Sequence, residues 1–242
     1  MDNVQHPLQT NNCEPLPGDK DWVDCGTYWL NINNQDTDGW ISARRLGWGH
    51  TKSLLTASNF GMAAGHSPFH KFIEVSEVSE LPSSPTEYIY KKTFTPEQEA
   101  HMKRGKKLES TARNHYENIT GNKVIEVGLA IPKFDIRIGA SVDGLISNDG
   151  CLEIKCAAKM YPKLTDPAFA NEHPSKRIYQ THYDQMIGEM VITNRSWCDY
   201  CVYTETPSIQ IYIERVPFDY KYWNEELYPK LLKFMSYNIA IK

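Results

Sequence analysis

Several features are missing from the 242-residue sequence, and each absence narrows the class of protein. No run of about eighteen apolar residues occurs, so no segment has the composition of a membrane-spanning helix. The first residues lack the basic start and the apolar stretch of a secretion signal. An excess of positive charge is also missing, because the formal net charge is −4. We expect an intracellular protein with no membrane partner, in which any surface that binds nucleic acid is local.

Cysteine is sparse, with six in the chain, and an intracellular protein keeps such thiols reduced. Cys198 and Cys201 form a CxxC pair within an apolar, aromatic segment that is typical of a strand. Residues three apart in a strand face opposite sides of a sheet, which is a poor geometry for holding one metal ion. We therefore expect ordinary core cysteines.

The chain divides into two parts by composition. Residues 1–37 are polar and show no hydrophobic period, which predicts a weakly ordered N-terminal arm with Trp22, Tyr28 and Trp29 as candidate anchors. Residues 38–242 have the size and the apolar content of a single domain. A surface loop is expected at residues 74–92, where prolines and serines gather.

Hydrophobic periodicity predicts the order of helices and strands in this domain. Helices are expected at residues 40–46, 56–65, 96–120, 175–193 and from residue 220 onward. Strands are expected at residues 124–131, 136–146, 151–156, 197–204 and 209–216. The helix at 96–120 has the clearest ends, because Thr95 and Gln98 match a capping box and Gly121 is a natural stop. The order indicates an α/β sheet with helices on its faces.

The sharpest functional signal lies in a hairpin with the turn NDG at residues 148–150. Asp143 stands at the end of the first strand, and Glu153 and Lys155 stand two apart on the second. The period of two in a strand places Glu153 and Lys155 on the same face and turns Ile154 away from it. The sequence thus predicts two acids and a lysine close together.

Such a group suits the hydrolysis of a phosphodiester. Two carboxylates and a backbone carbonyl are the hard oxygen ligands that Mg²⁺ prefers. A bound Mg²⁺ polarises a phosphoryl oxygen, and a neighbouring lysine can orient or deprotonate the attacking water. The alternative is a solvent-facing hairpin with an incidental cross-strand salt bridge. Apolar residues around Asp143 and on either side of Glu153 favour the active site.

Four separated segments extend this signal. They are WISAR (40–44) with TAS (56–58) and GHSPF (65–69), RGKKLESTAR (104–113), GASVDGL (139–145) with LEIKC (152–156), and HYDQ (182–185) continuing to residue 190. Together and in this order they resemble the phage lambda exonuclease and YqaJ-type viral recombinase family of PD-(D/E)xK nucleases, with Val142 in place of the proline. The resemblance implies a restriction-endonuclease-like α/β fold, with a mixed central sheet flanked by helices, and a single nuclease domain over residues 38–242.

The resemblance also implies roles for individual residues. Asp143, Glu153 and the carbonyl of Ile154 match the family's metal ligands, and Lys155 matches its catalytic lysine. The metal would be Mg²⁺, with Mn²⁺ as a substitute and two ions in all.

Two further residues match catalytic positions of the family. Glu109 would help to hold the second ion or its waters, and Gln185 would orient the water or the scissile phosphate. Each has a plainer alternative: Glu109 could form a surface pair with Arg113 at i,i+4, and Gln185 could be a solvated helix residue.

A pocket for the 5′-phosphate of a DNA end is also implied. Arg44, Ser58 and Ser141 match it, and guanidinium and hydroxyl donors suit that dianion. The gap from Arg44 to Ser58 is longer than the family usually shows, and Arg45 is an equally available guanidinium. Either arginine could therefore be the phosphate ligand. Ser58 could alternatively be only a helix cap.

For the whole protein, the resemblance implies a magnesium-dependent 5′-to-3′ exonuclease that acts on linear double-stranded DNA. The 3′ overhangs that it makes would serve recombination or repair through a single-strand annealing recombinase. The source would be a virus or mobile element, and the protein would act in the cytoplasm or nucleus of the host cell. A homotrimer is implied because lambda-type members form trimeric rings. Two alternatives are a structure- or site-specific endonuclease on the same core and a DNA-end binding protein that does not cut. Some related nucleases carry an iron–sulfur cluster on four cysteines, which is the alternative to core cysteines.

Overall fold

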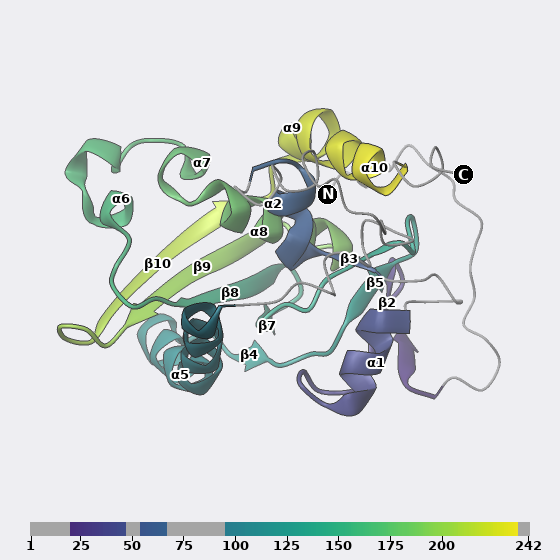
Figure 1. Ribbon diagram of the computed structural model, residues 1–242, viewed down its shortest axis with the longest axis horizontal. Coiled ribbons are helices and arrows are strands. Elements are labelled where there is room, and N and C mark those ends of the chain that lie inside the picture. The colour runs from purple at the N-terminus through teal and green to yellow at the C-terminus, as the bar shows by residue number, and fades with distance from the viewer. Residues whose placement is uncertain (1–19, 47–53, 67–94, 237–242) are drawn as a thin grey trace.

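A computed structural model describes residues 20–46, 54–66 and 95–236 of the chain. Its centre is a five-stranded sheet in the order β10-β9-β8-β7-β4 (Figure 1). Strands β8 and β9 run parallel, and the other neighbours pair antiparallel. The strands are β4 (Val124–Ile125), β7 (Gly144–Ile146), β8 (Gly150–Cys156), β9 (Trp197–Thr204) and β10 (Gln210–Pro217). A mixed central sheet flanked by helices was the predicted fold class, and it is confirmed.

The predicted hairpin is formed by β7 and β8. Ile146 pairs with Gly150, so the turn occupies residues 147–149, and Ser147 adopts a left-handed backbone with φ 52°. Gly150 is needed here because a Cβ at this position would lie 2.2 Å from the Trp197 ring of β9. The close approach lets Trp197 cover the start of the hairpin's second strand.

The two faces of β8 pack against two different helices. Leu152 and Ile154 belong to a cluster with Leu108, Ala112 and Tyr116 of α5 (Pro96–Thr120). The intervening residues of β8 face α8 (Gln180–Ile192), as the alternation of a strand requires. Figure 1 shows α5 and α8 on opposite sides of these strands.

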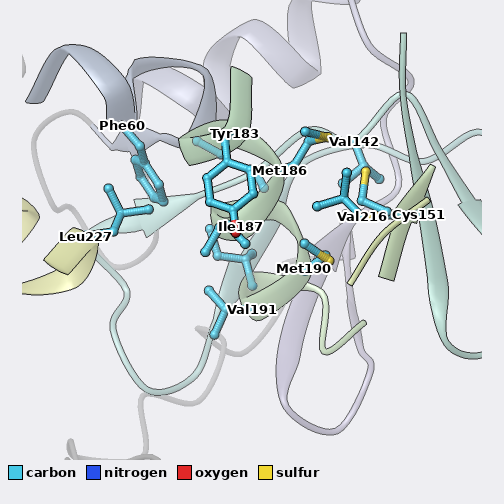
Figure 2. Close-up of a cluster of buried hydrophobic side chains, with 14 of the residues drawn as sticks. Phe60, Val142, Cys151, Tyr183, Met186, Ile187, Met190, Val191, Val216 and Leu227 are labelled. Carbon is cyan, nitrogen blue, oxygen red and sulfur yellow. The ribbon is translucent and has the colours of Figure 1, made fainter. Parts of the chain in front are cut away.

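Helix α8 is buried on nearly all of its surface. Figure 2 shows Met186 and Met190 towards Cys151, whereas Phe60 and Leu227 lie on the other side of the helix. Phe60 belongs to α2 (Phe60–Ala63) and Leu227 to the C-terminal helical segment. Polar side chains on α8 are therefore enclosed and must find partners inside the protein.

Cys198 and Cys201 occupy opposite faces of β9, as predicted. Cys198 packs in the cluster on the α8 side, and Cys201 packs in the cluster on the α5 side. All cysteines within the described residues are free thiols.

Most predicted helices form close to their predicted bounds. Helix α1 spans Asp38–Leu46, and α5 ends just before Gly121, which has φ 72°. The helix expected at residues 56–65 is a 3-10 turn (Ala57–Asn59) followed by α2. The C-terminal helix consists of α9 (Tyr220–Tyr222), a π-helical turn (Trp223–Leu227) and α10 (Tyr228–Ser236). Among the described helices, none is both long and apolar enough to cross a membrane.

The expectation of one helix over residues 175–193 is wrong. Helix α7 (Pro174–Arg177) ends at Ile178, whose ψ of 143° is extended, and α8 begins after Tyr179. Tertiary contacts explain the break: Arg177 forms two hydrogen bonds with Glu214 of β10, and Ile178 is buried. Short helical pieces α6 (Pro162–Thr165) and Pro167–Phe169 precede α7.

Two apolar runs expected to be single strands are each divided between sheets. Residues 124–131 supply β4 and part of β5 (Ala130–Pro132), and residues 136–146 supply β6 (Ile138–Gly139) and β7. Residues 126–129, which belong to no strand, separate the first pair, and a Cβ at Gly128 would lie 2.3 Å from the carbonyl oxygen of Asn31. The sequence pattern marked the apolar residues correctly but not the break between the two strands.

Residues 20–37 include two strands. Strand β2 (Tyr28–Asn31) pairs with β1 (Trp22–Asp24) and β5, and β6 pairs with β3 (Leu55–Thr56). Tyr28 and Trp29, two of the candidate anchors, are buried. Residues 1–19, the loop expected at 74–92 and the side chain of Gln98 lie outside the described residues. The boundary at residue 37 stays a prediction.

Candidate active site

A cavity of about 580 Å³ opens where the hairpin strands, α5 and α8 approach one another. Its lining includes every predicted site residue whose side chain is described: Arg44, Ser58, Glu109, Ser141, Asp143, Glu153, Ile154, Lys155 and Gln185. The side chain of Arg45, the alternative phosphate ligand, lies outside the described residues. Residues that are far apart in the sequence thus meet around one cavity.

A hydrogen bond joins Asp143 to β8, beyond the last paired residues of the hairpin. Asp143 precedes β7, and its Oδ2 accepts the N–H of Ile154 at 2.7 Å. Glu153 is 2% exposed, and its Oε1 lies 2.5 Å from Nζ of Lys155. Burial of Glu153 is inconsistent with the alternative of a solvent-facing hairpin with an incidental salt bridge.

Gln185 lies at the centre of the polar network. Its Nε2 donates to Oε1 of Glu153 and to Oε1 of Glu189, both at 2.8 Å, and its Oε1 accepts from Nζ of Lys155 at 3.0 Å. The alternative of a solvated Gln185 is therefore wrong. Glu189 also lines the cavity but was not predicted. A signal was available, because Glu189 stands one helical turn after Gln185 in an apolar stretch of α8.

Crowded carboxyl groups control the electrostatics of this site. Burial, reinforced by Glu153 and Glu109, raises the pKa of Asp143 well above its usual value. The pKa of Glu189 is raised by burial and then by Glu153. Burial alone would lower the pKa of Lys155, but the neighbouring carboxylates, Glu153 foremost, outweigh it and raise that pKa. In the absence of a cation, these carboxylates thus favour the ammonium form of Lys155, and both of its expected roles, orienting and deprotonating a water, stay predictions.

The donor set fits a hard divalent cation. Asp143, Glu153 and the carbonyl of Ile154 would supply oxygen ligands to such an ion, and Oε2 of Glu153 is buried with no hydrogen-bond partner among the described residues. Within the described ranges, no group of three or more His, Cys, Asp or Glu side chains is arranged so that it could hold a metal ion.

Glu109 reaches the cavity from α5, but it is already paired. Its Oε1 accepts from Arg113 at 2.7 Å, so the predicted alternative of an i,i+4 pair does form. Burial raises the pKa of Glu109, and Arg113 opposes that rise. A role for Glu109 beside a second ion stays a prediction.

The predicted phosphate-binding residues occupy another part of the cavity wall. An NH2 of Arg44 donates to Oγ1 of Thr56 at 3.2 Å, and Thr56 is bonded to Oγ of Ser58 at 3.2 Å. Trp40 donates from Nε1 to Oγ of Ser141 at 2.9 Å, and the Arg44 guanidinium lies 4.4 Å from the Trp40 ring centroid. Trp40 and Thr56 therefore hold these donors in place, a supporting role that spacing alone did not reveal.

Three solved structures that share the fold carry the name exonuclease. An alkaline exonuclease (LHK-Exo) from Laribacter hongkongensis is 23% identical, with a TM-score of 0.61, 84% of this chain and 93% of that one covered. Its complex with dAMP gives 24% identity, the same TM-score and the same coverage. A phage-related exonuclease from Haemophilus somnus 129PT is 12% identical, with a TM-score of 0.54, 76% of this chain and 93% of that one covered. These identities are low, so the likeness establishes the fold.

The family of this chain is identified from its sequence. No curated protein matches the chain significantly. The model of the YqaJ-like viral recombinase domain, however, matches residues 39–196, a segment that holds the whole lining of the cavity. The predicted resemblance is confirmed, and this chain belongs to the YqaJ-like viral recombinase family.

Proposed function

We propose that this protein is a deoxyribonuclease that digests linear duplex DNA from its ends. One observation carries the proposal: a single cavity joins the Asp143, Glu153 and Lys155 group to a set of donors suited to a terminal phosphate. An end-binding pocket next to a hydrolytic centre is what an exonuclease requires. The family, and the names of the structures that share the fold, support the same activity.

Each residue has a definite task in this mechanism. Asp143, Glu153 and the carbonyl of Ile154 would hold Mg²⁺ or Mn²⁺, with Glu109 near a second ion. A bound cation polarises the phosphoryl oxygen and lowers the pKa of a bound water. Lys155 as an ammonium stabilises the negative charge that develops on the phosphoryl group. Gln185 holds the Lys155 ammonium at 3.0 Å.

The proposed direction rests on the match of three residues to the family's 5′-phosphate pocket. Arg44, Ser58 and Ser141 would bind the 5′-phosphate, so that cleavage removes nucleotides in the 5′-to-3′ direction and leaves 3′ overhangs. Mononucleotides are the expected product, and the complex of a fold relative with dAMP supports this. The overhangs would pass to a single-strand annealing recombinase, and a trimeric ring would keep the enzyme on its substrate.

The test compares linear and covalently closed circular duplex DNA with Mg²⁺. Linear DNA should shorten from its 5′ ends and release mononucleotides, whereas circles should stay intact because they offer no end. Cutting of circles at a similar rate would replace this proposal with an endonuclease on the same core. Binding of ends without any cutting would make the protein an end-binding factor.

A further inference from the structure

The amide of Gln185 has only one favourable orientation. An amide nitrogen carries two hydrogens, and here both are used, one for Glu153 and one for Glu189 at 2.8 Å each. The amide oxygen faces the Lys155 ammonium at 3.0 Å. Rotating the amide by half a turn would place its oxygen against two carboxyl groups and its nitrogen against the ammonium. The surroundings thus fix which end of Gln185 meets Lys155.

The two acceptors that hold Gln185 are not equivalent. Oε1 of Glu153 also contacts Lys155, and the other oxygen of Glu153 is the unpartnered atom available to a cation. For Glu189, the hydrogen bond that its side chain accepts within the described part of the chain comes from Gln185, and its Oε1 is not shared with Lys155. Glu189 is therefore the acceptor that remains when Glu153 is engaged elsewhere.

Glu189 is an unfavourable residue for folding alone. It is 1% exposed on a helix that is otherwise apolar at this level, and its Oε2 is buried with no hydrogen-bond partner. A buried carboxyl group with an unmet oxygen lowers stability relative to an apolar side chain of similar size. Packing does not explain the acid, but its bond to Gln185 does.

We infer that Glu189 is a positioning residue of the hydrolytic site, which orients the amide of Gln185 so that its oxygen holds Lys155. The inference deepens the proposed function and rests on it. Glu189 touches neither DNA nor the reacting atoms in this role; it acts through Gln185. An acceptor oxygen is what the role requires, so a glutamine at this position can also fill it.

The test is a double-mutant cycle with isosteric side chains. Glu189→Met removes the acceptor at nearly constant volume, and we expect kcat to fall about ten- to a hundredfold. Glu189→Gln keeps an acceptor oxygen and should restore the rate to within about threefold of the wild type. In a Gln185→Met background, Glu189→Met should change kcat by less than about twofold, because the residue through which it acts is gone. Glu225→Met replaces an exposed acid that does not line the cavity, and it is the charge-matched control.

Two further readouts separate positioning from a structural role. Glu189→Met should raise or preserve the melting temperature while kcat falls, which a purely structural residue would not do. In the metal-free protein, the side-chain amide signals of Gln185 in a ¹H–¹⁵N spectrum should move in Glu189→Met and stay close to the wild type in Glu189→Gln. This readout does not need DNA cleavage, so an inactive wild type would refute the proposed function but not this contact.

The inference fails if Glu189→Met leaves kcat unchanged, or if it lowers kcat by the same factor with and without Gln185. Equal factors would mean that Glu189 acts directly, for example on a cation. Should Glu189→Met not fold, Glu189→Gln decides alone: a loss of more than about tenfold would show that the charge, and not the acceptor, is needed.

Discussion

Replacing Arg44 tests the phosphate pocket, because its guanidinium is the only fixed positive charge among the proposed phosphate ligands whose side chains are described. Losing a charge-assisted hydrogen bond to a phosphate dianion costs about 1.5–3 kcal/mol. If the bond is made in the transition state, this corresponds to about ten- to a hundredfold in rate. Arg44→Ala should therefore remove most of the preference for 5′-phosphorylated over 5′-hydroxyl ends.

The fold should survive this change. Arg44 makes a 3.2 Å bond to Thr56 and lies over the Trp40 ring, and such a cation–π contact contributes about 0.5–1 kcal/mol. The control is Arg215→Ala, because Arg215 also lies over a tryptophan, at 3.5 Å from the Trp197 ring centroid, but outside the cavity. This change also breaks two hydrogen bonds to buried Asp199, so it should cost more stability than Arg44→Ala and leave the phosphate preference unchanged. Arg44→Lys keeps the charge but loses the planar fork, so an intermediate preference is expected.

The assay measures initial rates on one linear duplex with 5′-phosphate or 5′-hydroxyl ends. Arg44→Ala should slow the phosphorylated substrate and barely affect the hydroxyl one. A wild type that ignores the phosphate would refute the pocket, and so would an Arg44→Ala variant that keeps the full preference.

Three other predictions follow from the same structure. Chelation should stop DNA cleavage, and added Mn²⁺ should restore it. Ca²⁺ should bind yet support little turnover, since it is larger and less strictly octahedral than Mg²⁺. Full activity in excess chelator would contradict a metal mechanism. Purified protein should be colourless and free of stoichiometric iron, because Cys198 and Cys201 face opposite sides of β9; an absorption band with about four irons per chain would favour the cluster-bearing relatives. Gly150→Ala should lower stability by about 1–3 kcal/mol through the clash with Trp197, measured by denaturant unfolding. Gly105→Ala, with nothing within 4 Å of its Cβ, should instead stabilise α5 by about 0.5–1 kcal/mol, and equal effects of the two changes would refute the packing argument.

Local patterns in the sequence predicted much of the geometry of this site. The period of two in β8 placed Glu153 and Lys155 towards the cavity, and the NDG turn located the hairpin. The same rule placed Cys198 and Cys201 on opposite faces. These predictions succeeded because backbone geometry alone decides them.

Features that depend on distant contacts were not accessible in the same way. The break at Ile178 follows from the pairing of Arg177 with Glu214, and spacing on a helix does not encode that contact. Glu189 stands one helical turn after Gln185, but it was missed because the sequence does not show that Glu153 shares the Gln185 amide with it. The raised pKa of Lys155 comes first from Glu153 on the same strand, but Asp143 and Glu189, which the fold brings near, add to it.

The central claim is that this cavity both binds DNA ends and cuts them, and it is tested most directly by separating these two steps. Asp143→Asn, Glu153→Gln and Lys155→Met should each abolish cleavage of linear duplex DNA with Mg²⁺. Each variant should keep its fold, and it should still bind a 5′-phosphorylated end with an affinity close to that of the wild type. Near-normal cleavage by any one of the three folded variants would contradict the claim.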